Sequence, residues 1–183
     1  MTYTVHSTES AAEGARSTLK AAKEAYGFVP NLLGVMAEAP ALLKGYATLS
    51  KIFEESSFTP AERQVVLLTT SFENGCSYCM AAHSAVAGMQ RVPQDVIQSL
   101  RTGDPITDAR LEALRQFTAK VVETRGWPAK ADVSAFHAAG FSKAQVLEVV
   151  LGVGLKTLSN YANHIADTPL DAAFKPLEWS RSA

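Results

Sequence analysis

The chain has 183 residues, 47% of them hydrophobic, and a formal net charge of -1 at pH 7. This length can bury one sizeable core, whereas two domains would each be small, so we expect residues 1–183 to form a single domain. The near-zero charge excludes the basic field that nucleic acids require, and without a run of like charge or an apolar run of bilayer length we expect no membrane partner.

Helical signals follow one another along the chain, and no stretch shows the alternation of a strand. In the first third, apolar residues recur at helical spacing between Gly and Pro residues that begin or end helices. The helices expected there span residues 10–26, 31–38 and 41–55. Farther on, the same signals predict helices over residues 60–74, 76–87, 93–101, 107–125, 131–139 and 146–161. The sequence therefore predicts an all-α fold.

Two of these helices are expected to begin with a capping box. In this arrangement a hydroxyl side chain and a Glu or Gln three residues later each bind the backbone N–H of the other. One pair is Thr59 with Glu62, and the other is Ser142 with Gln145. These two starts are the sharpest helix boundaries in the sequence.

Two features concern longer segments. Residues 59–83 and 142–164 share a capped start, a mostly apolar run and a terminal histidine, which suggests a weak internal two-fold repeat. The tail, residues 169–183, contains Phe174 and Trp179 and is too apolar for a linker, so we expect it to pack across the body or a neighbouring subunit. The functional prediction depends on neither feature, because it rests on the middle of the chain.

The most informative segment is the C-x-x-C motif formed by Cys76 and Cys79, the only two cysteines. In an α-helix, offsets of three, four and seven residues place Cys76, Cys79 and His83 on the same side. Asn74-Gly75 is a typical helix end, so Cys76 is expected to begin a new helix. The unpaired N–H groups and the dipole at a helix start favour a thiolate over a thiol. The segment therefore has the residues and the position of a redox-active dithiol.

Three other interpretations of the two cysteines were weighed. A structural disulfide would close a very small loop and would constrain the unfolded chain little. A structural zinc site needs four ligands, and the motif supplies three at most. A fourth ligand would have to come from a remote histidine, which could be His6, His137 or His164. Two inert buried cysteines are the third alternative.

The location expected from the sequence agrees with redox chemistry. The first residues lack the charged and apolar segments of a secretory signal, so we expect a cytoplasmic protein. In a reducing compartment, a C-x-x-C pair more often cycles between dithiol and disulfide than serves as a permanent cross-link.

The sequence around the motif resembles a known family. Residues 73–83, together with 59–68, are similar to the core of the alkylhydroperoxidase D-like (AhpD-like) branch of the carboxymuconolactone decarboxylase family, and the likeness extends in looser form to 26–33 and 160–164. The resemblance implies an all-α, AhpD-like helical bundle that assembles as homo-oligomers, often trimers or hexamers. It further implies reduction of hydroperoxides, or of a peroxiredoxin partner, by a cycling cysteine pair.

The roles that the resemblance implies fall on three residues. Cys79 would be the peroxidatic thiolate that becomes a sulfenic acid, Cys76 would resolve it to a disulfide, and His83 would complete the motif. A histidine one turn from the thiolate can accept or relay a proton. We expect an external dithiol, thioredoxin-like or lipoyl donor to reduce the disulfide, and we expect no metal and no organic cofactor.

The chain departs from the family pattern at Gln64, where the family has a glutamate in the proton relay. A glutamine cannot take a proton, although it can hold an imidazole by a hydrogen bond. The nearest carboxylate, Glu62, is explained by helix capping, and Glu73 is a solvated helix end. Tyr78, between the cysteines, is a weak proton carrier because a phenol titrates near pH ~10. The supporting relay is therefore assigned to Gln64, Glu62 and Tyr78, and turnover is expected to be slow.

Other residues and other functions were also weighed. Asn160 and His164 could reach the dithiol from a late helix, although a histidine there is more often a helix cap. Trp127 and Trp179 could line a pocket or serve as packing anchors. The rival enzyme function is decarboxylation of a lactone acid, which would leave the dithiol idle. The rival from another class is a non-catalytic scaffold or metal-binding protein.

Overall fold

The computed structural model describes residues 2–181, and over this range it contains nine α-helices, one 3-10 helix and no strand. The helices are α1 (Glu13–Tyr26), α2 (Asn31–Met36), α3 (Pro40–Glu54), α4 (Pro60–Glu73), α5 (Ser77–Met89), α6 (Gln94–Thr102), α7 (Ala109–Glu123), α8 (Lys130–Ala138), α9 (Lys143–Ala166) and the 3-10 helix η1 (Ala172–Leu177). The all-α prediction is confirmed.

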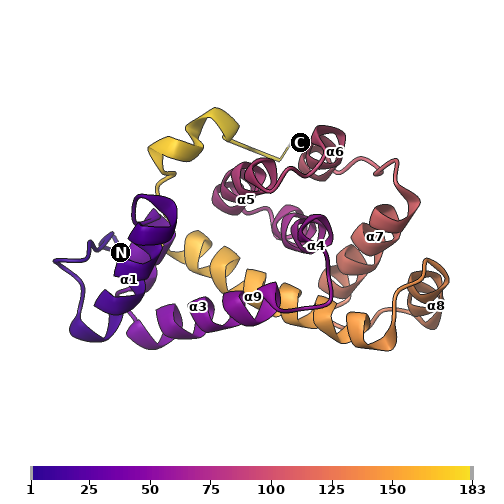
Figure 1. Cartoon of the computed structure of the whole chain (residues 1–183), viewed down its shortest axis with the longest axis horizontal. Coiled ribbons are helices and arrows are strands. Elements are labelled where there is room, and N and C mark those ends of the chain that lie inside the picture. Colours follow the sequence, from indigo (N-terminus) through magenta and orange to yellow (C-terminus); the bar gives the residue numbers. More distant parts are fainter. Residues whose placement is uncertain (1, 182–183) are drawn as a thin grey trace.

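Helix α4 is the central element of the fold. It packs against α5, α7 and α9, and Figure 1 shows it surrounded by these helices. Helices α2 and α3 lie along α9, α1 packs on α3, and α8 packs on α7 at the opposite end of the molecule. The C-terminal segment, yellow in Figure 1, returns across the body to α5. The C-terminal segment therefore contacts the helix that carries the C-x-x-C motif.

Buried apolar side chains form two clusters. The larger one surrounds α4, and in it the ring of Phe136 stacks on Phe117 at 4.4 Å and on Phe141 at 4.3 Å between centroids. The smaller one joins α1, α2 and α3 to the start of α5, and it contains both cysteines and Tyr78. The dithiol is thus packed among apolar side chains rather than held at the surface.

Both capping boxes are confirmed. The Glu62 N–H donates to Thr59 Oγ1 at 3.2 Å, and the Thr59 N–H donates to Glu62 Oε2 at 2.8 Å. At the second box, the Gln145 N–H donates to Ser142 Oγ at 3.2 Å and the Ser142 N–H to Gln145 Oε1 at 2.9 Å. Each box satisfies two N–H groups that the helix itself cannot pair.

Several helix boundaries differ from the prediction, and two of the largest differences are at the start of α1 and the end of α9. Helix α1 begins at Glu13 instead of residue 10, because the Ser7 N–H donates to Ser10 Oγ and holds a turn before the helix. Helix α9 continues to Ala166, past the predicted end at residue 161. Residues 59–83 therefore span two helices broken at Gly75, whereas residues 142–164 lie in one continuous helix and its cap.

The C-terminal segment packs on the body as expected. Phe174 lies edge-on to Phe28 at 5.8 Å and to Tyr78 at 6.2 Å between ring centroids. Trp179 is buried, and its Nε1–H donates to the Arg101 carbonyl at 2.7 Å. These contacts fix η1 over the first turn of α5.

Helix α9 has an unusual distribution of polar and apolar side chains. Its buried face carries the polar residues Lys156, Ser159, Asn160 and Asn163. Its exposed side chains include the large apolar residues Leu147, Val150, Tyr161 and Ile165, besides Lys143 and His164. Within residues 2–181 no single helix is long and apolar enough to cross a bilayer, and α8 with α9 passes that test only as a pair bent by 113°.

Candidate active site

The C-x-x-C motif lies where α4 gives way to α5. The Cys76 N–H donates to the Ser71 carbonyl at 2.9 Å and the Gly75 N–H to the Phe72 carbonyl at 3.0 Å, which together form a Schellman motif. Gly75 takes the left-handed conformation that this motif requires, with φ 67°. Cys76 is consequently the N-cap of α5, and Cys79 lies in its first turn. Both thiols are free, and each residue is 1% exposed.

Helix α9 supplies the polar groups around the two sulfurs. The Asn163 Nδ2–H group donates to Cys79 Sγ at 3.2 Å and lies 3.8 Å from Cys76 Sγ. Ser159 Oγ is 3.7 Å from Cys79 Sγ. An amide donor aimed at a sulfur stabilises the thiolate relative to the thiol.

Lys156 places a charge inside the protein beside Cys79. The residue is 1% exposed, and its Nζ has no hydrogen-bond partner among the described residues. Burial acts to lower the pKa of Lys156, but the charges of Cys79, Tyr46 and Cys76 together outweigh this effect and raise the pKa. Lys156 is therefore a buried ammonium group, and such groups in proteins normally have an anionic partner.

The two cysteines differ in acidity. Burial acts to raise the pKa of Cys79, but hydrogen bonding from Cys76 and the charge of Lys156 outweigh it and hold the pKa well below its ordinary value. The same hydrogen bond, together with burial, raises the pKa of the Cys76 thiol. Both effects favour ionisation of Cys79 over ionisation of Cys76. The N-terminal dipole of α5 acts on both cysteines, and the charge of Lys156 on α9 adds to it at Cys79, the residue to which the resemblance assigns the thiolate.

His83 is half-buried and is held by a chain of two amides. Its Nδ1 lies 3.1 Å from Gln64 Oε1, and Gln64 Nε2–H donates to Gln90 Oε1 at 3.1 Å. Because the Gln64 carbonyl can only accept, Nδ1 carries the proton and Nε2 is the acceptor. Burial, and next the charge of Lys156, holds the pKa of His83 well below its ordinary value. His83 is thus a neutral imidazole.

Tyr78 is engaged in a structural hydrogen-bond network. Its hydroxyl donates to Asp171 Oδ2 at 2.5 Å and accepts from the Leu32 N–H at 3.2 Å. Burial, and then the bond to Asp171, raises the pKa of Tyr78. The phenol therefore keeps its proton and joins α5 to α2 and to the C-terminal segment.

Glu62 belongs to a different part of the molecule. Its carboxylate completes the capping box of α4 and pairs with Arg110, with Nε 3.0 Å from Oε1. It is not among the residues that line the cavity beside the dithiol. Of the three candidates for the supporting relay, the structure brings only Gln64 into contact with His83.

The remaining candidates from the sequence lie away from the sulfurs. Asn160 is buried, but its amide contacts Asn74 at 2.9 Å and Ser71 at 3.4 Å. His164 is exposed, and so is Trp127. Trp179 packs against Phe72 at 5.8 Å between ring centroids and does not line the cavity.

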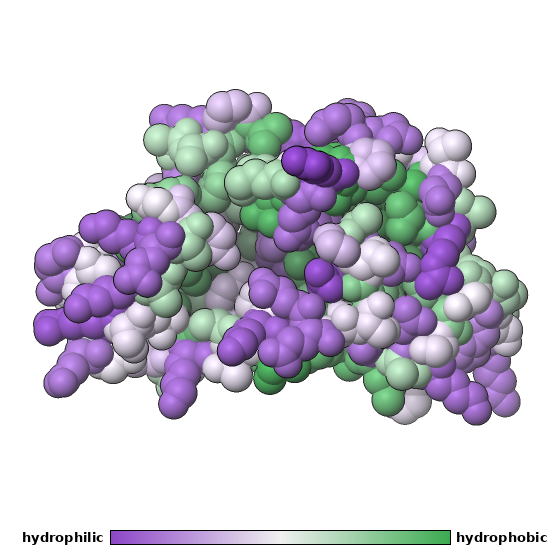
Figure 2. Space-filling model, viewed as in Figure 1, coloured by the Kyte–Doolittle hydropathy of each residue, from purple (hydrophilic) through white to green (hydrophobic). Residues whose placement is uncertain are grey.

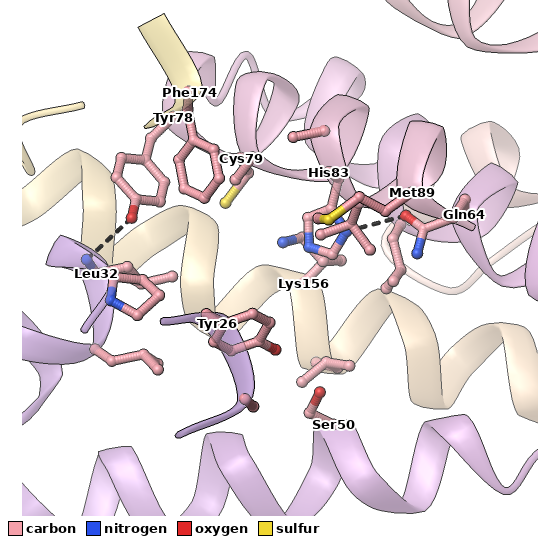
Figure 3. A pocket seen from close by; sticks show the side chains of 18 of the residues that line it. Tyr26, Leu32, Ser50, Gln64, Tyr78, Cys79, His83, Met89, Lys156 and Phe174 are labelled. Atoms are coloured by element: carbon pink, nitrogen blue, oxygen red, sulfur yellow. Dashed lines mark hydrogen bonds between the residues drawn. The ribbon is translucent and has the colours of Figure 1, made fainter. Parts of the chain in front are cut away.

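A cavity of about 440 Å³ opens beside Cys79, a volume suited to a small organic molecule. Cys79, His83, Gln64 and Lys156 lie on its wall, whereas Cys76 is behind the lining. The aromatic residues of the lining are Tyr26, Phe28, Tyr46, Phe53, Tyr78 and Phe174. The surface is hollowed between α1, α5 and the C-terminal segment (Figure 2). Figure 3 shows Lys156 reaching in beside His83, with Tyr26 and Ser50 across the space.

The geometry gives little support to a metal site. Within residues 2–181 no group of three His, Cys, Asp or Glu side chains is arranged to hold a metal ion. Of the remote histidines, His6 bonds Glu38 at 2.7 Å and His137 bonds the Phe141 carbonyl at 2.9 Å.

The residues of α9 that surround the dithiol were not predicted from the sequence. Lys156, Ser159 and Asn163 are spaced by three and four, so they share a helix face. This spacing was the feature of the sequence that could have identified the three residues as neighbours on one face of the helix. On a helix with many apolar residues, however, such a polar row normally indicates the solvent side.

Comparisons with known proteins agree with this architecture. The model of the carboxymuconolactone decarboxylase family matches residues 37–120. No curated protein matches the chain. Among solved structures, an alkylhydroperoxidase AhpD core protein from Ralstonia eutropha JMP134, described as uncharacterized and peroxidase-related, is similar at 22% identity with TM-score 0.83, covering 94% of this chain and 93% of that one.

Two further structures share the fold. A peroxidase-related protein from Silicibacter sp. TM1040 has 22% identity and TM-score 0.76, covering 89% of this chain and 87% of its own. A variant of the debrominase Bmp8 in complex with 2,3,4-tribromopyrrole has 16% identity and TM-score 0.79, covering 96% and 94%. The family model thus covers α3 to most of α7, and the fold of these solved structures extends over nearly the whole chain.

Proposed function

We propose that the protein is a thiol-dependent, peroxidase-like oxidoreductase that reduces an organic hydroperoxide with the Cys76/Cys79 dithiol. The observation that carries the proposal is the asymmetry of the pair. Cys79 lies on the wall of the cavity as a stabilised thiolate, and Cys76 lies behind it as a protonated thiol. Peroxide reduction needs this division, since one sulfur attacks and the other resolves.

The proposed cycle has two steps in the protein. The Cys79 thiolate attacks the terminal oxygen of the hydroperoxide, the O–O bond breaks, and the products are a Cys79 sulfenic acid and an alkoxide that takes a proton. The Cys76 sulfur then attacks the Cys79 sulfur, and the departing hydroxide leaves as water with the Cys76 proton. The hydroperoxide is reduced to an alcohol and the dithiol is oxidised to a disulfide.

The burial of both sulfurs bears on the electron donor. Each cysteine is 1% exposed, and only Cys79 faces the cavity. A slim dithiol, such as a small molecule or a lipoyl arm, can enter a cavity of about 440 Å³, whereas the motif of a folded thioredoxin-like donor would have to displace the lining. We therefore favour a slim dithiol, which would transfer its thiol proton to Nε2 of the neutral His83.

The same site supports a second candidate, reductive debromination of an aromatic compound. Aromatic rings line the cavity, and the debrominase Bmp8 has the same fold. The Cys79 thiolate would attack the bromine atom, leaving a ring carbanion that takes a proton. Cys76 would then displace bromide and form the disulfide, so that the carbon–bromine bond is reduced and the dithiol oxidised.

One turnover assay separates these functions. Purified protein is supplied with dihydrolipoamide and either cumene hydroperoxide or a brominated pyrrole, and the native chain is compared with Cys79→Ser. Hydroperoxide consumption that is lost in the variant supports the peroxidase, and bromide release alone supports the debrominase. Thiol-independent release of carbon dioxide from a lactone acid, or zinc bound to both thiols, would overturn both.

The proposal includes a setting for the enzyme. Residues 1–183 form one domain, and the enzyme is a cytoplasmic homo-oligomer, a trimer or hexamer. A peroxiredoxin is an alternative substrate. The exposed apolar side chains Leu147, Val150, Tyr161 and Ile165 on α9 are the surface that a second copy would cover. Light scattering should show a lower mass for Val150→Glu than for the native chain.

A further inference from the structure

The proposed hydroperoxide reduction needs an acid that protonates the departing oxygen. The identity of this acid is the subject of a further inference, which rests on the proposed function. An alkoxide is a poor leaving group, so a positioned proton donor is worth about 10² to 10⁴ in rate. The candidates are the ionisable groups on the cavity wall near Cys79. They are His83 and Tyr78 on α5, Tyr46 on α3 and Lys156 on α9.

His83 does not fit the role of acid. Its Nδ1 proton is directed at Gln64 Oε1, 3.1 Å away, and Nε2 carries no proton in this tautomer. Gln64 cannot pass a proton to the ring, because its amide Oε1 accepts from His83 and its Nε2 donates to Gln90. His83 is therefore suited to accept a proton and unsuited to supply one.

The two tyrosines are also unsuited. The Tyr78 hydroxyl donates to Asp171 at 2.5 Å, so its proton is held by a carboxylate at the edge of the cavity. Burial raises the pKa of Tyr46, and the pKa of Lys156 is raised as well, so the acidity before the reaction does not separate these two groups. Neither phenol carries the positive charge that would also stabilise the thiolate.

Lys156 meets the geometric requirements. It is 1% exposed, it lies on the cavity wall with Cys79, and its Nζ has no hydrogen-bond partner among the described residues. The ionisable groups around it are Cys76, Cys79 and His83 from α5 and Tyr46 from α3, while α2 carries none. Arg63 of α4 and Glu54 of α3 also line the cavity. Although the charge of Cys79 acts on it, Nζ donates no hydrogen bond to a described residue, so it has donor capacity for a ligand in the cavity.

We propose that Lys156 is a catalytic residue with two linked roles, as the charge partner of the Cys79 thiolate and as the proton donor to the departing oxygen. The roles are linked by charge balance. Before the reaction, the ammonium faces a thiolate. When Cys79 becomes a neutral sulfenic acid, the buried ammonium loses its partner and becomes a stronger acid at the moment the alkoxide forms. Transfer of one proton from Nζ to the alkoxide then leaves the site without net charge, and solvent returns the proton to the lysine.

The first experiment tests the charge partner without any peroxide. The rate of Cys79 alkylation by iodoacetamide is followed by mass spectrometry over a range of pH in the native chain and in Lys156→Met. Removal of a neighbouring charge should raise the pH midpoint by about one to three units. The exposed residue Lys143, also on α9, provides the matched control, and Lys143→Met should leave the midpoint unchanged.

The second experiment tests the proton donor through the leaving group. Cumene hydroperoxide releases an alkoxide that needs a proton, whereas a peroxy acid releases a carboxylate that does not. At a pH where Cys79 is ionised in both proteins, Lys156→Met should lose at least about a hundredfold in rate with cumene hydroperoxide and much less with the peroxy acid. Lys156→Arg keeps the charge but is a far weaker acid, so it should retain the native alkylation midpoint and still show the selective loss.

The outcomes are distinguishable. Equal alkylation midpoints for native protein and Lys156→Met, with both folded by circular dichroism, would overturn the charge-partner role. Equal losses with the two peroxides would overturn the proton-donor role. If the native protein reduces no hydroperoxide, the proposed function and the proton-donor role fail together, whereas the alkylation midpoint still decides the charge partner.

Discussion

The two walls that meet at the dithiol, the first turns of α5 and the second half of α9, differ in what they contribute. Helix α5 supplies the reacting groups, with Cys76 at its N-cap and Cys79 and His83 behind it. Helix α9 supplies Lys156 and Asn163, which have no redox chemistry of their own but lie against Cys79. The motif on α5 supplies the atoms that react, and the polar face of α9 favours ionisation of the Cys79 sulfur.

This difference also explains the unusual surface of α9. A helix with one polar and one apolar face normally buries the apolar face. Here Lys156, Ser159 and Asn163 face inward toward the sulfurs, so Leu147 and Ile165 are left outside. The arrangement costs hydrophobic burial, and the gain is a polarised environment for one thiolate.

The largest expected effect comes from the α5 wall, through the two cysteines. Cys79→Ser should abolish thiol-dependent turnover, because a serine hydroxyl does not attack the peroxide at neutral pH. Cys76→Ser should stop turnover after one oxidation and leave Cys79 as a sulfenic acid, which a dimedone adduct would reveal. A dimedone adduct at residue 76 in Cys79→Ser would reverse the assigned roles.

The next largest effect, a loss of Cys79 reactivity, should come from a change at Asn163 on the α9 wall. Asn163→Asp keeps the shape of the side chain but places a negative charge where an amide donates to Cys79 at 3.2 Å. A like charge disfavours the thiolate, so alkylation of Cys79 at pH 7 should slow by about tenfold or more. Asn163→Leu removes the donor without adding charge and should give a smaller change in the same direction. Faster alkylation in either variant would contradict the role of α9.

A third test changes the support of His83. Because burial lowers the folded-state pKa of His83, the unfolded chain binds more protons below about pH 6.5, and the free energy of unfolding should fall as the pH is lowered through that range. Gln64→Glu adds a carboxylate beside the ring, which should raise the pKa of His83 and reduce this acid-side loss. The ring signal in an NMR titration and urea unfolding between pH 5 and 8 provide the measurements. An unchanged titration would mean that residue 64 does not control His83.

The smallest effect should be at Tyr78, which serves α5 as an anchor. Tyr78→Phe removes the hydroxyl that joins Asp171 to the Leu32 N–H, so about 1 to 3 kcal/mol of stability should be lost in urea unfolding. The alkylation midpoint of Cys79 should change little, because Tyr78 is a neutral group. A large shift of that midpoint would show that Tyr78 acts on the thiolate after all.

Local sequence signals were sufficient for most helix boundaries and for the position of the motif. Gly75 ended α4 where Asn-Gly predicted it, and the boxes at Thr59 and Ser142 began α4 and α9. Such signals succeed because capping and left-handed glycine conformations depend on residues a few positions apart. The late end of α9, at Ala166, was missed because the residue that ends the helix in the left-handed conformation is Asp167 and not a glycine.

By itself, the sequence determined an all-α chain with two cysteines at a helix start and a histidine one turn beyond, since each of these follows from contacts within one or two helical turns. Only the tertiary structure showed which side chains favour ionisation of Cys79, which side chains line the cavity and which face of α9 is buried. Those outcomes depend on Lys156 and Asn163, which lie about eighty residues from Cys79 in the chain and meet it only when α9 packs against α5. Electrostatic effects act through space at short range, so a local pattern in α5 cannot contain them.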